Sequence, residues 1–374
     1  AFAVLLLPLV LLALPVSSAA AEEATFSISG TINDSVTQLP VEGIDVAVRH
    51  ADGHVTYGQP SDATGAYVIS GLAPGEYNVM TQNSVGYVDE WYDNVIDQGN
   101  GSTGADIINL MDSDVTGIDF ELDLGGTISG TVTGIGAGPL AEVIVTLRTE
   151  DGNWLGRHAF TAGDGSYALT GIAPGTYKIH TQNGQSFIDE WHEDLAYQNN
   201  YYGDGATTIG VVSDGTVNVD FELEPGRSIS GHVTDALGTP VSDISIYVTD
   251  PVGNHIYVWT HPTASDGAYT IGGLLPGVYK IRTVNAQEYG YVNEWYDNIP
   301  DQGNGSTAAG LIDLSTSNAT GINFELEEGR SISGTVTGSG GGPLGDVFVR
   351  LRDEAGNWLN YTWTGPDGTY VLEG

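Results

Sequence analysis

Asp164-Gly165-Ser166-Tyr167-Ala168-Leu169-Thr170-Gly171-Ile172-Ala173-Pro174-Gly175-Thr176-Tyr177 is the stretch that decides the fold of this chain. Its Asp-Gly pair predicts a tight turn, after which Tyr167 and Leu169 alternate as one face of a strand. Pro174-Gly175 fits the central positions of a type II turn, because proline fixes φ and glycine accepts a positive φ. The strand resumes at Tyr177. The stretch therefore predicts a β-hairpin with a turn at each end.

The same pattern recurs along the chain, at residues 65–77, 266–279 and, in part, 367–370. The glycine of each Ile-Ser-Gly start gives the period: Gly30, Gly130, Gly231 and Gly334 lie 100, 101 and 103 residues apart. A unit of about 100 residues can bury its own core, unlike the repeats of 20 to 50 residues that must stack to be stable. We therefore expect three full repeats and part of a fourth, each folding as a separate bead.

The predicted repeats span residues 27–126, 127–227 and 228–330, with an incomplete repeat at 331–374. Each has an Ile-Ser-Gly strand, an alternating second strand such as 143–148, a third strand, the Tyr-containing stretch and a closing Phe-x-Leu. Alternation of apolar and polar residues indicates a sheet with one solvated face. About seven strands suffice for two packed sheets. Because only a few residues link one repeat to the next, we expect a monomeric, semi-rigid rod.

The amino-acid composition excludes several kinds of site and partner. The 374 residues include 53 Gly and 15 Pro, which favours an all-β chain with many turns, and no Cys, which excludes disulfides, thiolate metal sites and a cysteine nucleophile. The 48 acidic and 10 basic side chains give a net charge of -38. Such a surface repels nucleic acid and anionic membranes and attracts cations. We expect no nucleic-acid partner.

The N-terminal residues predict export. Residues 2–16 are almost entirely apolar and lead to small residues ending at Ala21. The apolar run is shorter than the roughly 20 residues that span a membrane, so residues 1–21 are interpreted as a signal peptide truncated at its N-terminus. An uncleaved anchor is the alternative. We expect a secreted or cell-surface protein without a membrane span after cleavage.

The order Ile-Ser-Gly-x-Val-Thr, alternating strand, Asp-Gly-x-Tyr, Gly-Leu-x-Pro-Gly-x-Tyr and Phe-x-Leu resembles the carboxypeptidase regulatory-like domain. This is a transthyretin-like (prealbumin-like) β-sandwich that occurs in tandem on secreted bacterial proteins. The resemblance covers nearly everything after the signal segment. It implies tandem seven-stranded sandwiches placed end to end and a non-catalytic role beside or between other modules. The roughly 25 residues that precede each closing strand are longer than the minimal domain needs.

Those extra residues hold a recurring aromatic motif. Trp stands beside Tyr or His and among acids and amides in each full repeat: Trp91 and Tyr92, Trp191 and His192, Trp295 and Tyr296. Aromatic rings with nearby carboxylates and amides suit glycan contact. The alternative is that each indole packs against its own sandwich, with its N–H bonded locally. Catalysis by paired carboxylates is disfavoured, because an active site is needed once and packing is needed in every repeat.

A second motif follows each Trp segment. Asp97 and Asn100, and likewise Asp301 and Asn304, lie in Gly-rich loops whose oxygens could wrap a calcium ion. The spacing is not that of an EF-hand, and Asn-Gly is also a common tight-turn pair. No cofactor is required, and calcium is the one cation these loops suggest.

These observations predict a non-enzymatic spacer or adhesion stalk of tandem sandwiches. No zincin, nucleophile-elbow or phosphate-loop motif is present in the sequence. One alternative is a carbohydrate-binding array that uses the Trp segments. Another is the accessory region of a secreted hydrolase. An extracellular glycan or protein is the expected partner.

Overall fold

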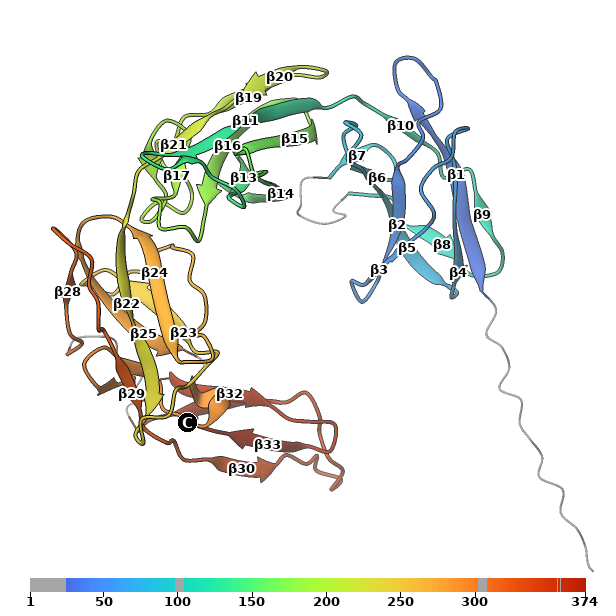
Figure 1. The fold of residues 1–374 in the computed structure, drawn as a ribbon. Coiled ribbons are helices and arrows are strands. Elements are labelled where there is room, and N and C mark those ends of the chain that lie inside the picture. The colour runs from blue at the N-terminus through green and yellow to red at the C-terminus, as the bar shows by residue number, and fades with distance from the viewer. Residues whose placement is uncertain (1–24, 98–103, 285, 302–307, 355, 357) are drawn as a thin grey trace, which may run out of the picture. The chain divides into compact units, whose positions relative to one another are not determined.

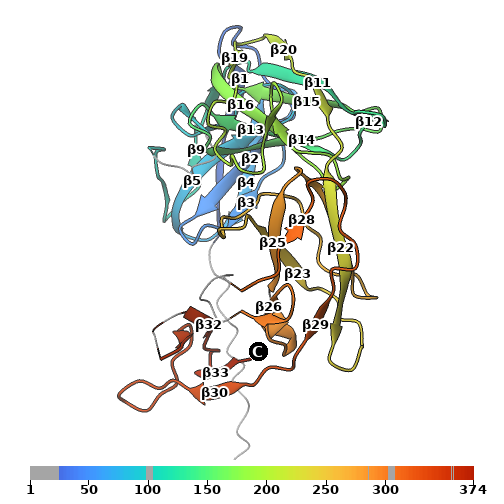
Figure 2. The same ribbon diagram turned by 90° about the vertical axis from the view of Figure 1, so that its left-hand side faces the viewer.

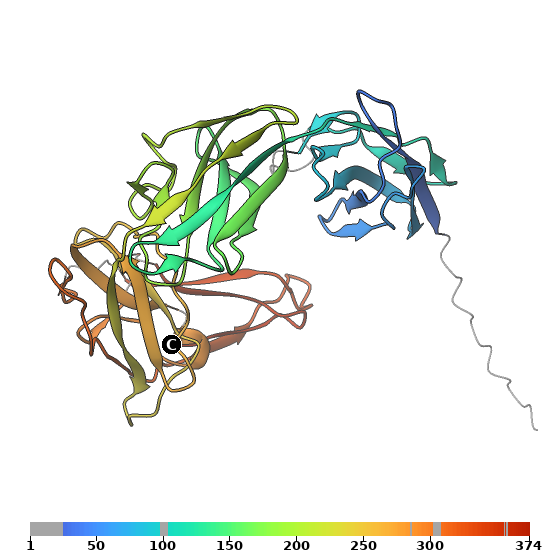
Figure 3. The same ribbon diagram turned by 45° about the horizontal axis from the view of Figure 1, so that its top comes forward.

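The computed structural model describes residues 25–97, 104–284, 286–301, 308–354, 356 and 358–374. Strands and loops make up these residues, with one short 3-10 helix at Ala286–Tyr289 (Figure 1). Contacts divide the chain into two compact units. The first holds the described residues up to Gln82 together with Glu90–Val95 and Gly104–Leu122, and the second holds the rest. Figure 2 and Figure 3 show the same strands from two further directions.

The first unit is a pair of sheets. Its strands are β1 (Phe26–Asp34), β2 (Asp45–His50), β3 (Val55–Tyr57), β4 (Ala66–Leu72), β5 (Gly75–Gln82), β6 (Glu90–Trp91), β7 (Val95–Ile96), β8 (Ile108–Leu110), β9 (Val115–Thr116) and β10 (Phe120–Leu122). One sheet has the order β10-β1-β4, with β9 also on β1, and the other has the order β3-β2-β5-β6-β7, with β8 on β5.

The second unit repeats this plan. The strands of residues 126–223 are β11 (Gly126–Gly134), β12 (Gly138–Pro139), β13 (Ile144–Thr149), β14 (Trp154–Phe160), β15 (Ser166–Ile172), β16 (Gly175–Gln182), β17 (Glu190–Trp191), β18 (Leu195–Ala196), β19 (Ile209–Val211), β20 (Thr216–Asn218) and β21 (Phe221–Leu223). β11 pairs antiparallel with β15 and parallel with β21, while the second sheet has the order β14-β13-β16-β17-β18. The fold is therefore all-β and built from β-sandwiches, as the sequence predicted.

The remaining strands follow the same order. They are β22 (Arg227–Asp235), β23 (Ser245–Thr249), β24 (Ala268–Leu274), β25 (Val278–Val284), β26 (Glu294–Trp295), β27 (Ile299–Pro300), β28 (Ile312–Asp313), β29 (Phe324–Leu326), β30 (Ile332–Thr335), β31 (Phe348–Arg352), β32 (Trp358–Trp363) and β33 (Thr369–Leu372). The residue boundaries of the four repeats stay predictions.

The deciding stretch is not a hairpin. β15 pairs with β11 in one sheet, whereas β16 pairs with β13 in the other. The turn between them therefore carries the chain from one layer to the other. Near this turn the positive φ lies at Gly171 (67°), before Pro174, and Gly175 is not among the residues with positive φ, so the type II turn at Pro174-Gly175 was a wrong prediction.

Two tyrosines of the stretch explain why the motif holds its shape. The hydroxyl of Tyr167 donates to the carbonyl oxygen of Val219 at 2.7 Å, and that of Tyr177 donates to Ala173 at 2.8 Å. The first bond ties the strand to the segment before the closing strand, and the second closes the arch between the layers. The same pairs recur as Tyr67 with Ile118, Tyr77 with Ala73, Tyr269 with Ile322 and Tyr279 with Leu275.

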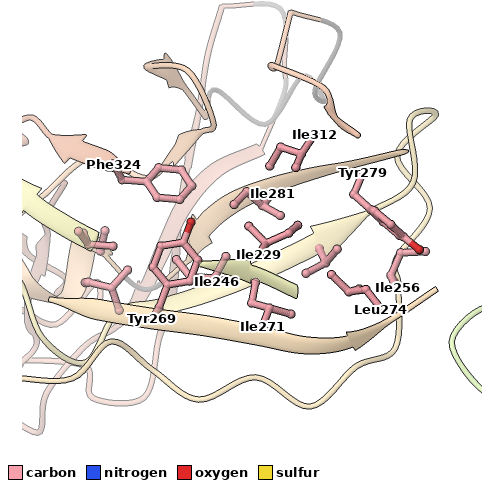
Figure 4. Close-up of a cluster of buried hydrophobic side chains, with 14 of the residues drawn as sticks. Ile229, Ile246, Ile256, Tyr269, Ile271, Leu274, Tyr279, Ile281, Ile312 and Phe324 are labelled. Atoms are coloured by element: carbon pink, nitrogen blue, oxygen red, sulfur yellow. The ribbon is translucent and has the colours of Figure 1, made fainter. Parts of the chain in front are cut away.

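The inward faces of the two layers form the core. In the third repeat, Ile229 and Ile271 of one sheet meet Ile246 and Ile281 of the other, with Phe324 among them (Figure 4). The second repeat has its own cluster, centred on residues such as Ile128, Leu147 and Ile179, and the two clusters share no residue. The second and third repeats thus each bury their own apolar face.

Candidate functional site

Each Trp segment is a small β-hairpin added to the edge of a sheet. β17 pairs with β16 through Trp191 and His180, and then with β18. The loop contains two residues with positive φ, Glu193 (66°) and Asp194 (63°), and the other repeats have Asp93, Asn94, Asp297 and Asn298 in the same conformation. Asn and Asp tolerate positive φ better than most residues, so much of the acid-amide composition here serves the turn.

The indoles of all three segments are buried. Trp91, Trp191 and Trp295 are 3%, 0% and 6% exposed. The Trp191 N–H donates to the carbonyl oxygen of Asn200 at 2.8 Å, and its ring lies 4.6 Å from that of His180. Gly203 approaches so closely that a Cβ there would lie 2.9 Å from the indole. A ring enclosed in this way has no face left for a sugar.

The neighbouring rings are only half-buried, and they pack inward as well. Tyr92, His192 and Tyr296 each meet the closing-strand phenylalanine edge to face, with centroids 5.9, 6.1 and 6.2 Å from Phe120, Phe221 and Phe324 respectively. The geometry of all six predicted glycan-contact residues is that of packing residues. In the second repeat, Trp191 also forms a second, smaller core with Tyr197 and Ala206.

The exposed aromatic residues are others, which the sequence analysis did not single out. Trp154, Trp259 and Trp363 are 53%, 42% and 58% exposed. Along β14, every second residue is exposed from Trp154 to Phe160. That alternation of W, G, H and F was visible in the sequence and could have marked these rings as solvent-facing.

Buried carboxylates accompany the Trp motif. Glu190 is 7% exposed, no hydrogen bond of the described residues reaches its carboxylate, and it lines a pocket of about 310 Å³ with Asp194, Glu222 and Glu224. Burial, then repulsion from Asp194 and Glu224, raises the pKa of Glu190 to about 8. Its counterpart Glu294 has an Oε1 atom without a partner among the described residues. Burial raises the pKa of Glu294 to about 7.

This arrangement predicts that Glu190→Gln stabilises the second repeat in alkali. The folded-state pKa lies above the value of about 4.3 expected for an unfolded chain, so the folded protein holds the extra proton between these pH values. The free energy of unfolding therefore falls as pH rises from about 4 through 8. Glutamine stays neutral, so the melting temperature of the variant should exceed that of the wild type by several degrees at pH 9 and match it near pH 4.

Thermal unfolding at pH 4, 7 and 9 checks this expectation, with Glu150→Gln as the control because Glu150 is exposed in the same repeat. A Glu190→Gln effect of equal size at all three pH values would contradict it.

Part of the predicted calcium loops lies beyond the structure's described residues, namely Asn100 and Asn304. Asp301 pairs with Arg282 at 2.5 Å, which uses one carboxylate oxygen for an ion pair. In the second repeat, the equivalent loop bonds to itself: Asn200 Oδ1 accepts from the Asp204 N–H at 2.7 Å. Among the described residues, no group of three or more acidic, His or Cys side chains could hold a metal ion. The site formed by Asp97, Asn100, Asp301 and Asn304 stays a prediction.

The clearest built feature of the second unit is a joint between its second and third repeats. Gln198 is 1% exposed and reaches 75 residues along the chain, where its Nε2 donates to the carbonyl oxygen of Gly273 and its Oε1 accepts from the Leu275 N–H at 3.2 Å. Its own carbonyl oxygen accepts from the Tyr257 N–H at 3.1 Å. The counterparts Gln98 and Gln302 fall outside the described residues.

Stacked rings surround this clamp. Tyr197 lies parallel to His180 with centroids 4.3 Å apart, and Tyr201 lies 4.6 Å from Tyr257. Arg148 covers Tyr201 at 4.8 Å. Burial, with a smaller contribution from Arg148, lowers the pKa of His180 to about 3, so the imidazole is neutral at ordinary pH. The joint is therefore a packed contact that does not depend on charge at the histidine.

Comparison with known proteins agrees with this architecture. The carboxypeptidase regulatory-like domain family matches residues 27–110 and 228–327. The chain carries tandem carboxypeptidase regulatory-like domains. It is 24% identical over 370 residues to the serine-aspartate repeat-containing protein D of Staphylococcus aureus, an alignment that covers 89% of this chain and 28% of that protein. Against the serine-aspartate repeat-containing protein F of Staphylococcus epidermidis it is 23% identical over 267 residues, covering 64% and 15%.

Two solved structures are also similar to this array of carboxypeptidase regulatory-like domains. The Streptococcal ancillary pilin matches 82% of this chain and 99% of its own, at 12% identity and a TM-score of 0.28. BcpA, the major pilin subunit of Bacillus cereus, matches 82% and 100%, at 14% identity and a TM-score of 0.21. The chain spans about a quarter of the length of its first curated relative. It is a secreted or cell-surface protein, and no helix in its described part is both long and apolar enough to cross a membrane.

Proposed function

We propose that this chain is a non-catalytic spacer or adhesion stalk, in which tandem carboxypeptidase regulatory-like sandwiches hold another module away from the surface that carries them. The observation that carries the proposal is the Gln198 joint: two repeats with separate cores are clamped by a buried side chain. Similarity to serine-aspartate repeat-containing proteins over 89% of the chain supports a surface role.

A fixed joint matters for a spacer, because an array of domains on flexible linkers has a shorter average end-to-end distance than a rigid one. Gln198 makes its side-chain bonds with backbone atoms of the third repeat, and the ring of Tyr201 packs on Tyr257 beside it. The net charge of -38 adds like-charge repulsion over about one Debye length, roughly 8 Å at physiological salt. Both effects oppose folding of the array back on itself.

The alternatives that the sequence left open gain no support. A glycan-binding array through Trp91, Trp191 and Trp295 would need exposed indoles, and these are buried. Nothing favours an accessory role in a hydrolase over the spacer role. The proposed partner is an extracellular protein or glycan, and the proposed role involves no catalysis.

We expect Gln198→Ala to loosen the joint without unfolding either repeat, because the clamp lies outside both cores. The chain has no Cys, so spin labels can be placed at Ser213→Cys and Thr320→Cys, both exposed, and their distance distribution measured by pulsed dipolar spectroscopy. The distribution should broaden at least twofold in Gln198→Ala.

The matched control is Gln185→Ala, since the Gln185 amide donates to Ala141 within a single repeat. An unchanged distribution in Gln198→Ala, or the same broadening in the control, would overturn the clamp.

A further inference from the structure

A second pocket lies beside the joint and serves no part of the spacer role. It has a volume of about 280 Å³ and is lined on one side by Trp259 and His261 and on the other by the loop at residues 183–186. The Trp259 N–H donates to His261 Nε2 at 3.2 Å, which fixes the two rings relative to each other. Unlike the indoles of the Trp segments, Trp259 is 42% exposed. The Trp259 indole is therefore accessible to a ligand that binds in the pocket.

The loop that faces this indole carries backbone strain. Ser186 has a φ of 70°, whereas the same position holds Gly86 (101°) in the preceding repeat and Gly290 (81°) in the following one. Their equivalence is shown by the bond that each carbonyl oxygen accepts: Gly125 donates to Gly86, Gly226 to Ser186 and Gly329 to Gly290. A left-handed conformation is costly for serine and free for glycine. Residues held in such a conformation by the surrounding structure are concentrated at ligand-binding sites.

The Ser186 hydroxyl lies against the backbone of Gly272. A Cβ at Gly272 would lie 2.2 Å from Ser186 Oγ, so a residue with a side chain there would displace the hydroxyl. The side chain of Asn183 holds the loop from below, accepting from the Gln185 N–H at 2.9 Å and donating to Asp189 at 2.6 Å. The loop is therefore rigid before any ligand arrives, which lowers the entropic cost of binding.

Apart from His261, the polar side chains that line the pocket are hydroxyls and an amide, which carry no charge. Ser186 and Thr270 are exposed residues, and no hydrogen bond among the described residues involves either hydroxyl. No Lys or Arg lines the pocket, and the chain as a whole carries a charge of -38, so an anionic ligand would be repelled. An aromatic surface opposite free hydroxyls is the arrangement that binds the apolar face and the hydroxyl edge of a sugar ring.

We propose that the pocket formed by Trp259, His261 and Ser186 binds a single ring of a neutral saccharide. The indole packs on the C–H face of the ring, and the serine and threonine hydroxyls bond to its edge. The volume suits one hexose ring, since it lies just below the range of drug-sized sites, about 300 to 1,000 Å³. This inference is independent of the spacer role and places glycan recognition away from the motif that the sequence first suggested.

The test is saturation-transfer NMR on the whole chain with the methyl glycosides of glucose, galactose, mannose and N-acetylglucosamine. At least one should bind with a dissociation constant in the millimolar range, as expected for a ligand of this size. Trp259→Ala should weaken that binding at least tenfold. Ser186→Gly should weaken it several-fold and raise the melting temperature, because the strain is relieved while the hydroxyl is lost.

Trp154→Ala is the control, because Trp154 is an exposed tryptophan on another strand and should leave binding unchanged. Failure of every glycoside to bind the wild type rejects the proposal, and so does undiminished binding by Trp259→Ala. Binding of an aromatic peptide in place of the glycosides would also reject it. Glycoside binding and the label distances are measured independently. A negative result for the saccharide pocket therefore leaves the proposed spacer role untouched, and the reverse also holds.

Discussion

Gly130→Ala should prevent the second repeat from folding stably. A Cβ at this position would lie 1.8 Å from the carbonyl oxygen of Val219, which is backbone and cannot move aside as a side chain would. The equivalent distances at Gly30 and Gly231 are 2.0 and 1.8 Å, so the Ile-Ser-Gly glycine is needed where the first strand meets the segment before the closing strand. We expect a loss of about 4 kcal/mol or more in the free energy of unfolding, a large share of the total for one domain.

Hydrogen exchange read by mass spectrometry is the suitable measurement, because it reports each repeat separately in a chain that need not unfold in one step. Gly163→Ala is the matched control: it lies in the same repeat, its φ is not positive, and nothing lies within 4 Å of the added Cβ. The control should change stability by about 0.5 kcal/mol or less. Retained protection of β11 and β15 in Gly130→Ala would contradict the account of this glycine.

Trp191→Ala should destabilise the second repeat by about 3–5 kcal/mol, the usual cost of removing a fully buried tryptophan. The indole is 0% exposed, packs on His180 and caps the loop through its bond to Asn200. Its removal would leave a cavity beneath Gly203 and would remove one of the two hydrogen bonds that the Asn200 carbonyl oxygen accepts, the other coming from the Gly203 N–H. Because Tyr197 stacks on the same histidine, the joint to the third repeat should loosen as well.

Denaturant unfolding with hydrogen exchange measures this change, and Trp154→Ala provides the comparison. Trp154 is 53% exposed, so its removal should cost about 1 kcal/mol at most. If Trp191→Ala left stability intact and instead abolished binding to a glycan, the packing role would be wrong and the earlier ligand interpretation would return.

The order of strands could be predicted from sequence because local signals specify it. Period-two alternation of the sequence marked β13, and a tight turn was expected at Asp164-Gly165, where the Asp164 carboxylate accepts from the Ser166 N–H. Pairing between strands was not predictable in the same way. Pro174-Gly175 is compatible with both a hairpin and an arch between layers, and only the distant partners β11 and β13 decide between them.

The aromatic motif shows a similar limit. Sequence identifies Trp191 as a large ring beside acids, but its burial depends on Gly203 and Asn200, which fold over it from a later loop. The sequence analysis offered two roles for Trp191, glycan contact and packing with a locally bonded N–H. The geometry favours packing. The Gln198 joint carried no sequence signal, since its partners lie about 75 residues away and are backbone atoms.

The label distance between Ser213→Cys and Thr320→Cys in the otherwise unaltered chain tests the central claim most directly. If consecutive sandwiches are held by a packed joint, the distribution should be a single narrow peak that chelators and high salt leave in place. A broad distribution, like that of two beads on a free linker, would contradict the claim that this chain acts as a semi-rigid spacer.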